Sequence, residues 1–395
     1  MSTLAVTRIG TLFSGIMEKP LISGADTVLC RDGAIAAIGS AADLAAEITN
    51  ADQVLDVDGA TVAPGLIDSH GHVTIGDYTP RQKAVDFLES YVHGGVTRMI
   101  SAGEVHVPGR ARDREAVKAL AVTARTVFEN IRPGGMRVHA GNVLLEPTLT
   151  EEDFRHLVRC GVWLAKFGFG AYPDPLDAVE QIRLAKSCGL LVMCHAGGVS
   201  AAGSAALRAA EIMALDPHVC GHANGGPTAM PDADVDRLLY DTRMVLQVVQ
   251  AGNLRSGLRL VRRAEATGAL HRVVVGSDTP SGFGVMPLAV LKTVVELSAL
   301  APLEPAVSWA LATGNVARAW GLSAGRVQSG ADADLVVLDA PLGGVATDAA
   351  GAMRNGDVPG ISAVVTDAEV RALTSRNTPK ARRQATLVAR RPVTH

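Results

Sequence analysis

Between residues 63 and 320, the chain repeats one pattern: a short apolar run ends in polar or small residues and is followed by a stretch of helix length. Such runs are typical of buried strands, and their alternation with amphipathic stretches is typical of βα units around a parallel sheet. Eight units in roughly 260 residues are what an α/β fold of the (β/α)8 type, the TIM barrel, requires. The predicted strands end at residues 70–72, 101–103, 144–146, 166–168, 194–195, 221–222, 249–250 and 277–278.

The two ends of the chain have a different pattern. Short β-type runs separated by Asp-Gly turn signals occupy residues 1–62, and similar runs return at 333–339 and 361–365. We therefore predict that residues 1–62 and 321–375 form one composite β-sandwich domain and that residues 63–320 form the barrel.

The C-terminal tail, residues 376–395, contains Lys and Arg but no Asp or Glu. We interpret this basic tail as a solvated or oligomer-packing terminus, and the alternative is an arm that binds an anion or a partner.

Composition and charge narrow the class of protein. With 48% hydrophobic and 19% charged residues, the chain is expected to fold around a large core. Its net charge of -3 provides no field for nucleic acid, and no uninterrupted apolar run reaches the roughly 18 residues of a membrane span. The five cysteines form no C-x-x-C pair, and the first residues lack the pattern of a secretory signal. A cytoplasmic protein with a small-molecule partner is expected.

His70 and His72 are separated by one residue at the end of the first predicted strand. Their side chains therefore project to the same face and can converge on one metal ion. Taken alone, the pair could equally be structural or exposed.

The pair stands in the run APGLIDSHGH at residues 63–72, which closely resembles the first-strand motif of the amidohydrolase superfamily. Barrels of that superfamily carry metal ligands at the ends of strands one, four, five, six and eight. The resemblance implies two divalent ions, with zinc expected first and iron or manganese as alternatives. The ligands it implies are His70, His72, Lys166, His195, His222 and Asp278. Each of these residues also has a structural interpretation as a satisfied core or surface group.

Lys166 lies in the apolar run 162–168, where a charged amine is costly without a partner. Burial would lower its pKa and expose the neutral amine, the form that reacts with carbon dioxide. In superfamily members with two metals, this lysine is N6-carboxylated and bridges the ions. The alternatives are a lysine that extends to solvent or that pairs with Asp278.

Asp278 resembles the strand-eight aspartate of the superfamily, which binds metal and also moves protons. The resemblance implies a hydrolase in which a metal-bridging hydroxide attacks an amide-like carbonyl and Asp278 carries the proton to nitrogen. A non-catalytic barrel scaffold is the alternative outside enzyme chemistry.

Narrower motifs, among them GDYTPRQK at 76–83, ATGN at 312–315 and SRNTP at 375–379, are similar to the enamidases of this superfamily. This resemblance implies a substrate that is a small cyclic amide or enamide with a carboxylate, similar to 6-oxo-1,4,5,6-tetrahydronicotinate. It also implies a homo-oligomer, with a tetramer expected. Enamidases have a glutamate where this chain has Lys166, at the bridging position. N-acyl amino acids, dipeptides and hydantoin-like rings remain alternative substrates.

Three further residues are candidates for contacts with the substrate. His139, on the third predicted strand, is expected either to donate a hydrogen bond to the developing oxyanion or to pack in the core. His106 and Arg110 follow the second strand on the side where active sites are built, and a guanidinium suits a carboxylate. Surface charge is the alternative for Arg110.

Overall fold

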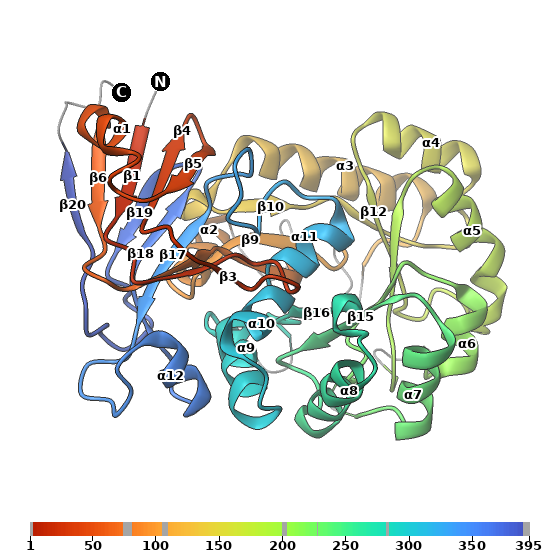
Figure 1. Cartoon of the computed structure of the whole chain (residues 1–395). Coiled ribbons are helices and arrows are strands. Elements are labelled where there is room, and N and C mark those ends of the chain that lie inside the picture. Colours follow the sequence, from red (N-terminus) through yellow and green to blue (C-terminus); the bar gives the residue numbers. More distant parts are fainter. Residues whose placement is uncertain are drawn as a thin grey trace.

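The computed structural model describes residues 3–73, 81–104, 110–199, 204–226, 228–281 and 284–389, with the side chains of 81–86 and 389 left aside. These residues form a mixed α/β fold with four sheets (Figure 1), which confirms the predicted α/β class. Two sheets are wholly parallel, with the orders β10-β9-β8 and β11-β12-β13-β14-β15-β16. Their strands are β8 (Leu66–Gly71), β9 (Val96–Ser101), β10 (Arg137–His139), β11 (Asn142–Leu144), β12 (Leu164–Phe167), β13 (Leu191–Cys194), β14 (Val219–Cys220), β15 (Val245–Val249) and β16 (Val273–Gly276).

The third predicted strand is divided into β10 and β11. Gly141 separates them with a φ of 89°, and a Cβ at this position would lie 2.7 Å from the Cβ of Arg125. A glycine is therefore needed at the break. β10 pairs with β9, whereas β11 pairs with β12.

The other edges of the two parallel sheets, β8 and β16, also approach each other. A single parallel bridge joins Gly71 to Thr279, and the Asp278 N–H donates to the His70 carbonyl at 2.8 Å. The ends of β8 and β16 are thereby held side by side, which is what places His70, His72 and Asp278 together.

Helices lie outside these strands in Figure 1 and cover them with apolar faces. Two of the helices, α3 and α8, begin with a side-chain cap: Asp113 accepts from the Ala116 N–H, and Asn253 accepts from the Ser256 N–H. The helices are α2 (Arg81–Val92), α3 (Arg114–Asn130), α4 (Glu151–Arg159), α5 (Val179–Ser187), α6 (Ala209–Leu215), α7 (Asp232–Asp241), α8 (Leu254–Ala266), α9 (Ala289–Leu300), α10 (Pro305–Leu311) and α11 (Gly314–Trp320), with short 3-10 turns at Pro133–Gly135, Pro175–Ala178 and Leu270–Arg272.

The other two sheets combine strands from both ends of the chain. Their orders are β20-β6-β1-β4-β5 and β19-β18-β17-β7-β2-β3, and β17 pairs with β7 across more than 270 positions of sequence. Leu4, Val28 and Leu55 share one buried cluster with Leu335 and Val365. The elements are β1 (Thr3–Thr7), β2 (Thr11–Phe13), β3 (Leu21–Ile22), β4 (Thr27–Arg31), β5 (Ala34–Gly39), α1 (Ala45–Asn50), β6 (Gln53–Asp56), β7 (Thr61–Pro64), β17 (Leu335–Asp339), α12 (Ala349–Arg354), β18 (Gly360–Thr366), β19 (Glu369–Leu373) and β20 (Thr386–Ala389).

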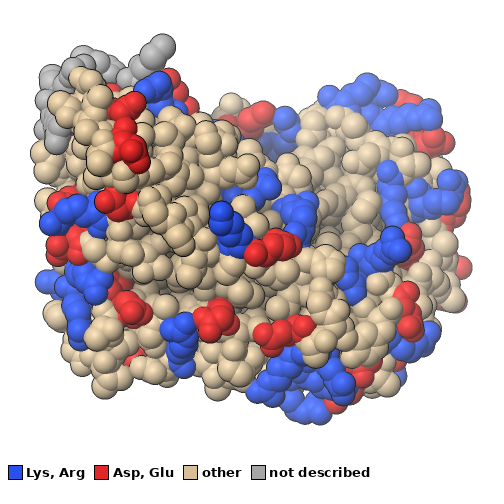
Figure 2. All heavy atoms as spheres, viewed as in Figure 1, with Lys and Arg blue, Asp and Glu red and all other residues tan. Residues whose placement is uncertain are grey.

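Strand β20 belongs to the predicted basic tail and pairs antiparallel with β6, which the sequence did not indicate. On the face shown in Figure 2, basic and acidic side chains are interspersed, in keeping with the small net charge. Within the part of the chain that the structure describes, no helix combines the length and the apolar character needed to cross a membrane.

Candidate metal centre

Three side chains meet where β8 and β16 end. His72 Nε2 lies 2.9 Å from Asp278 Oδ1, and His70 Nε2 lies 3.3 Å from the same oxygen. One potential ligand atom from each residue lies within 4.8 Å of the others, so the three can surround one cation. Asp278 reaches this position with a left-handed φ of 58°, a conformation that a non-glycine residue adopts at a cost.

His222 and His195 extend the cluster from β8 towards β13. The ring centroids of His70 and His222 are 5.5 Å apart, and those of His222 and His195 are 4.5 Å apart. His195 Nε2 lies 2.8 Å from the Gly198 carbonyl, to which it can only donate, so Nδ1 of a neutral ring keeps its lone pair. His222 Nδ1 is buried and has no hydrogen-bond partner among the described residues.

Lys166 stands on β12 with only 1% of its surface exposed, which excludes the alternative of a lysine extended to solvent. Its Nζ has no hydrogen-bond partner within the described part of the chain. Burial lowers the pKa of Lys166 to about 8, with the charge of Asp278 opposing the effect. A fraction of this amine is therefore neutral near pH 7 and available for reaction.

The electrostatics of the cluster favour histidine rings that are neutral and can bind metal over rings that are protonated. Burial holds the pKa of His70 and of His222 well below the usual value and lowers the pKa of His195 to about 4, so all three rings are neutral. Although burial would raise the pKa of Asp278, interactions with His70 and His72 hold it well below the usual range. Neutral imidazoles beside an ionised carboxylate are the donor set of a borderline divalent cation such as zinc, iron or manganese.

The buried donor atoms without partners also fit bound metal. Buried polar atoms almost always have a partner, and Lys166 Nζ and His222 Nδ1 are exceptions that lie beside the histidine cluster. Ions held by the cluster, together with a carboxylated Lys166, would supply the missing partners.

Gln247 contributes to this cluster, although its role was not predicted. It lies on β15, fully buried, with its Oε1 2.6 Å from His70 Nδ1. The available signal was a lone amide inside the apolar run 244–249, MVLQVV. Such a residue needs buried polar partners on a neighbouring strand.

His139 is not among the residues that meet at the cluster, and its contacts favour the alternative of core packing over that of an oxyanion donor. Its ring packs edge-on against Trp163, at 5.8 Å between centroids, and Trp163 precedes β12. Burial and the charges of Arg98 and Arg137 lower the pKa of His139 to about 3. β10 ends at His139, before the break at Gly141, whereas β11 continues to Leu144.

Arg110 lies at the same end of the strands as the cluster, but it is already paired. Its guanidinium donates to Glu146 at the end of β11, and Nη2 lies 3.4 Å from the Phe169 carbonyl after β12. Glu146 is nearly fully buried, and Arg112 Nε approaches its second oxygen at 3.7 Å. The group of two arginines and one glutamate thus has one net positive charge. His106 lies outside the described residues.

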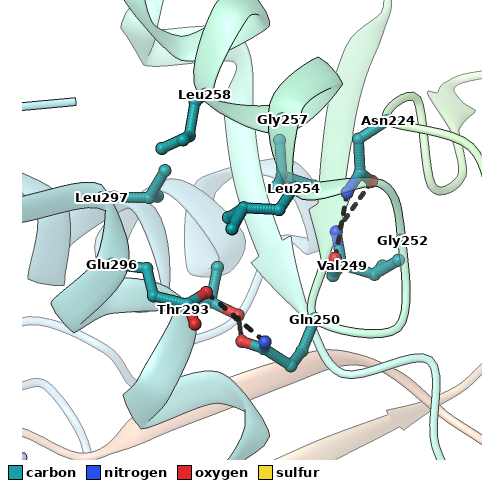
Figure 3. A pocket seen from close by; sticks show the side chains of 11 residues that line it. Asn224, Val249, Gln250, Gly252, Leu254, Gly257, Leu258, Thr293, Glu296 and Leu297 are labelled. Carbon is teal, nitrogen blue, oxygen red and sulfur yellow. Dashed lines mark hydrogen bonds between the residues drawn. The ribbon is translucent and has the colours of Figure 1, made fainter. Parts of the chain in front are cut away.

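A separate pocket lies beyond the end of β15, between α8 and α9 (Figure 3). Gln250 accepts the Thr293 hydroxyl at 2.6 Å there and lies 3.3 Å from Glu296, while Leu254 and Leu258 form the apolar wall. Its lining includes none of the six predicted metal ligands.

Comparison with known proteins places the chain in a family. The pattern of the amidohydrolase family matches residues 61–370. Enamidase of Eubacterium barkeri is 43% identical over 389 residues, with 98% of this chain and 100% of that protein covered. An imidazolonepropionase of Streptomyces griseus is 27% identical over 384 residues, with 86% of this chain and 94% of that protein covered.

Solved structures give the same result. The crystal structure of enamidase superimposes with a TM-score of 0.93 at 43% identity and covers 98% of this chain and 100% of that one. A putative prolidase from Bifidobacterium longum, with a TM-score of 0.63 at 20% identity and 96% of both chains covered, shares the fold. From its strand-end histidines, its sheet order and these matches, we conclude that the chain belongs to the amidohydrolase family.

Proposed function

We propose that this chain is a metal-dependent hydrolase with two divalent ions that opens the ring of a small cyclic amide or enamide bearing a carboxylate, similar to 6-oxotetrahydronicotinate. The main support is the convergence of His70, His72 and Asp278 within 4.8 Å beside His222 and the buried Lys166. The similarity to an enamidase over 98% of the chain favours the cyclic enamide among amide substrates.

The proposed scaffold is a closed eight-stranded barrel with a composite β-sandwich at its side. Two observations support closure. β10 and β11 follow each other as one interrupted strand, and the bridge between Gly71 and Thr279 links β8 to β16. The shared buried cluster of Leu4 and Leu335 supports the sandwich domain built from both chain ends.

The proposed ligands are His70, His72, Lys166, His195, His222 and Asp278, with zinc as the expected metal. Lys166 would be N6-carboxylated: the neutral amine adds to carbon dioxide, a C–N bond forms and one proton is lost. The burial of Lys166, its lowered pKa of about 8 and its lack of a hydrogen-bond partner among the described residues support this.

When bound, divalent ions lower the pKa of a water molecule and polarise the substrate carbonyl. Hydrolysis breaks the ring C–N bond, forms a C–O bond to the oxygen of water and leaves the nitrogen in need of one proton. Asp278, whose pKa lies well below the usual range, is the group that we propose accepts a proton from the water and delivers it to this nitrogen.

The substrate carboxylate is proposed to contact Arg110, with His106 as a second contact. Glu146 and the Phe169 carbonyl hold the Arg110 guanidinium in one orientation, and the nearby Arg112 leaves this group with a net positive charge. A fixed, partly neutralised guanidinium suits reversible binding of a carboxylate.

We further propose a cytoplasmic homo-oligomer, with a tetramer expected. All five cysteines are free, which agrees with a reducing compartment. Light scattering of the purified protein tests the oligomeric state.

The proposed activity is tested with a panel of cyclic and linear amides, followed by proton release, on protein whose metal content is known. Turnover of a carboxylate-bearing cyclic enamide, with about two divalent ions per chain, is the expected result. Turnover of linear amides alone would favour the N-acyl amino acid or dipeptide alternative. A folded, metal-free and inactive protein would favour a scaffold.

A further inference from the structure

The buried amide of Gln247 connects three strands beneath the metal cluster. Its Oε1 lies 2.6 Å from His70 Nδ1 and 3.2 Å from the His222 main-chain nitrogen. Its Nε2 donates to the Ser69 carbonyl at 3.0 Å and to the Ser69 hydroxyl at 2.8 Å. All four hydrogen-bonding positions of the amide are therefore used, and none of them by solvent.

The main chain determines which way this amide faces. A peptide N–H can only donate and a carbonyl oxygen can only accept, so the His222 N–H requires Oε1 on its side and the Ser69 carbonyl requires Nε2 on the other. A flipped amide would oppose both groups. The two backbone partners therefore assign the amide without the ambiguity of a side-chain rotor.

The direction of the amide in turn determines the tautomer of His70. Because Oε1 is an acceptor, Nδ1 of His70 carries the hydrogen, and the neutral ring keeps its lone pair on Nε2. That atom lies 3.3 Å from Asp278 Oδ1. A lone pair facing a carboxylate at this distance is unfavourable unless a cation lies between them.

We propose that Gln247 is a positioning residue that fixes the tautomer and ring direction of His70 and thereby sets the affinity of the centre for its divalent ions. This inference rests on the proposed metal-dependent function. Carboxylates and carbonyls often hold metal-binding histidines in this way, and an amide does so without adding a negative charge. Through its contact with His222, the same side chain also sets the distance between two of the proposed ligands.

The test compares zinc binding to metal-stripped wild type, Gln247→Met and a matched control, Gln250→Met. Methionine has a similar length but cannot serve His70, His222 or Ser69. Gln250 comes directly after the end of β15, and its amide contacts Thr293 and Glu296 instead (Figure 3). Competition with a chromophoric chelator should show zinc affinity about 10- to 100-fold weaker in Q247M and unchanged in Q250M.

Urea unfolding of the metal-free proteins separates positioning from general destabilisation. A second variant, Ser69→Ala, removes one of the two acceptors of Nε2 and is expected to fold even where Q247M does not. Its zinc affinity should fall about threefold, as for the loss of one hydrogen bond.

Wild-type zinc affinity in folded Q247M, or an equal loss in Q250M, would overturn the inference while leaving the proposed function intact. Unchanged zinc affinity in S69A would overturn it where Q247M cannot be obtained folded. Failure of wild type itself to bind any divalent ion would overturn the proposed function, and this inference with it.

Discussion

His72 Nε2 lies 2.9 Å from Asp278 Oδ1, although the two residues are 206 positions apart in the chain. The contact exists because β8 and β16 end side by side and because Asp278 adopts a left-handed backbone conformation directly after β16. A carboxylate held beside two imidazoles can serve both as a metal ligand and as a proton carrier. The expected consequences of this arrangement can be measured one residue at a time.

Replacing Lys166 with Ala should remove both bound metal and activity. The buried amine is the proposed source of the bridging carbamate, and alanine leaves no oxygen in its place. Small carboxylic acids should partly restore both properties by occupying the vacated space. Elemental analysis and turnover assays measure the effect, with Lys292→Ala on the exposed face of α9 as the control. Unchanged metal content in K166A would contradict the bridging role.

Asp278→Asn should retain part of the bound metal but lower kcat by about 10²- to 10⁴-fold, the usual contribution of a positioned acid or base. The amide keeps one oxygen near His72 but cannot accept and return a proton. Metal analysis beside steady-state kinetics separates the two roles. Activity within a few fold of wild type would show that another group moves the proton.

His139→Phe should leave kcat/KM unchanged within about threefold, because the ring packs against Trp163 away from the cluster. A loss of about 100-fold or more, typical of a missing oxyanion donor, would support the oxyanion alternative for His139.

The same variant should change the pH dependence of stability. The pKa of His139 is about 3 in the folded protein and about 6.5 when unfolded, so the unfolded state binds more protons between these values. The contribution of the neutral His139 ring to folding stability is complete above pH 6.5 and is lost as the pH falls towards 3. The free energy of unfolding, measured with urea from pH 4 to 6.5, should therefore rise less steeply with pH in H139F than in wild type. The difference in slope corresponds to at most one proton. Equal slopes would contradict the buried neutral imidazole.

Arg110→Met should raise KM for carboxylate-bearing cyclic amides by about tenfold or more and leave an uncharged analogue unaffected. The single change also removes the close ion-pair partner of the buried Glu146, and this loss by itself destabilises the protein. The double variant R110M/E146Q removes both charges and serves as the control. An equal rise in KM for charged and uncharged substrates would show that Arg110 acts only through structure.

Local sequence pattern was sufficient to place most of the parallel strands. Each predicted strand end coincides with, or lies within two residues of, the end of an observed strand: Leu144 ends β11 and Gly276 ends β16. Apolar runs and turn residues report strand position because their spacing follows the geometry of a single element. His70 and His72 could likewise be placed on one face from their spacing alone.

The outcome differed for residues whose roles depend on contacts between elements. The break at Gly141 divides the third strand and leaves His139 facing Trp163, because the close approach of Arg125 permits only glycine there. Arg110 is paired with Glu146, a residue whose burial follows from the packing of β11 and not from its neighbours in sequence.

Gln247 shows most directly the difference between what the sequence indicates and what the tertiary structure determines. The residue type of Gln247 and its place in the sequence indicate only a polar residue in a buried strand. Its proposed function depends on a carbonyl of β8 and a peptide N–H after β14, which packing brings within hydrogen-bond distance. The order and ends of the strands follow from short-range periodicity. The direction of a hydrogen bond across the interior depends on the register of strands that are distant in sequence, so it became visible only in the folded chain.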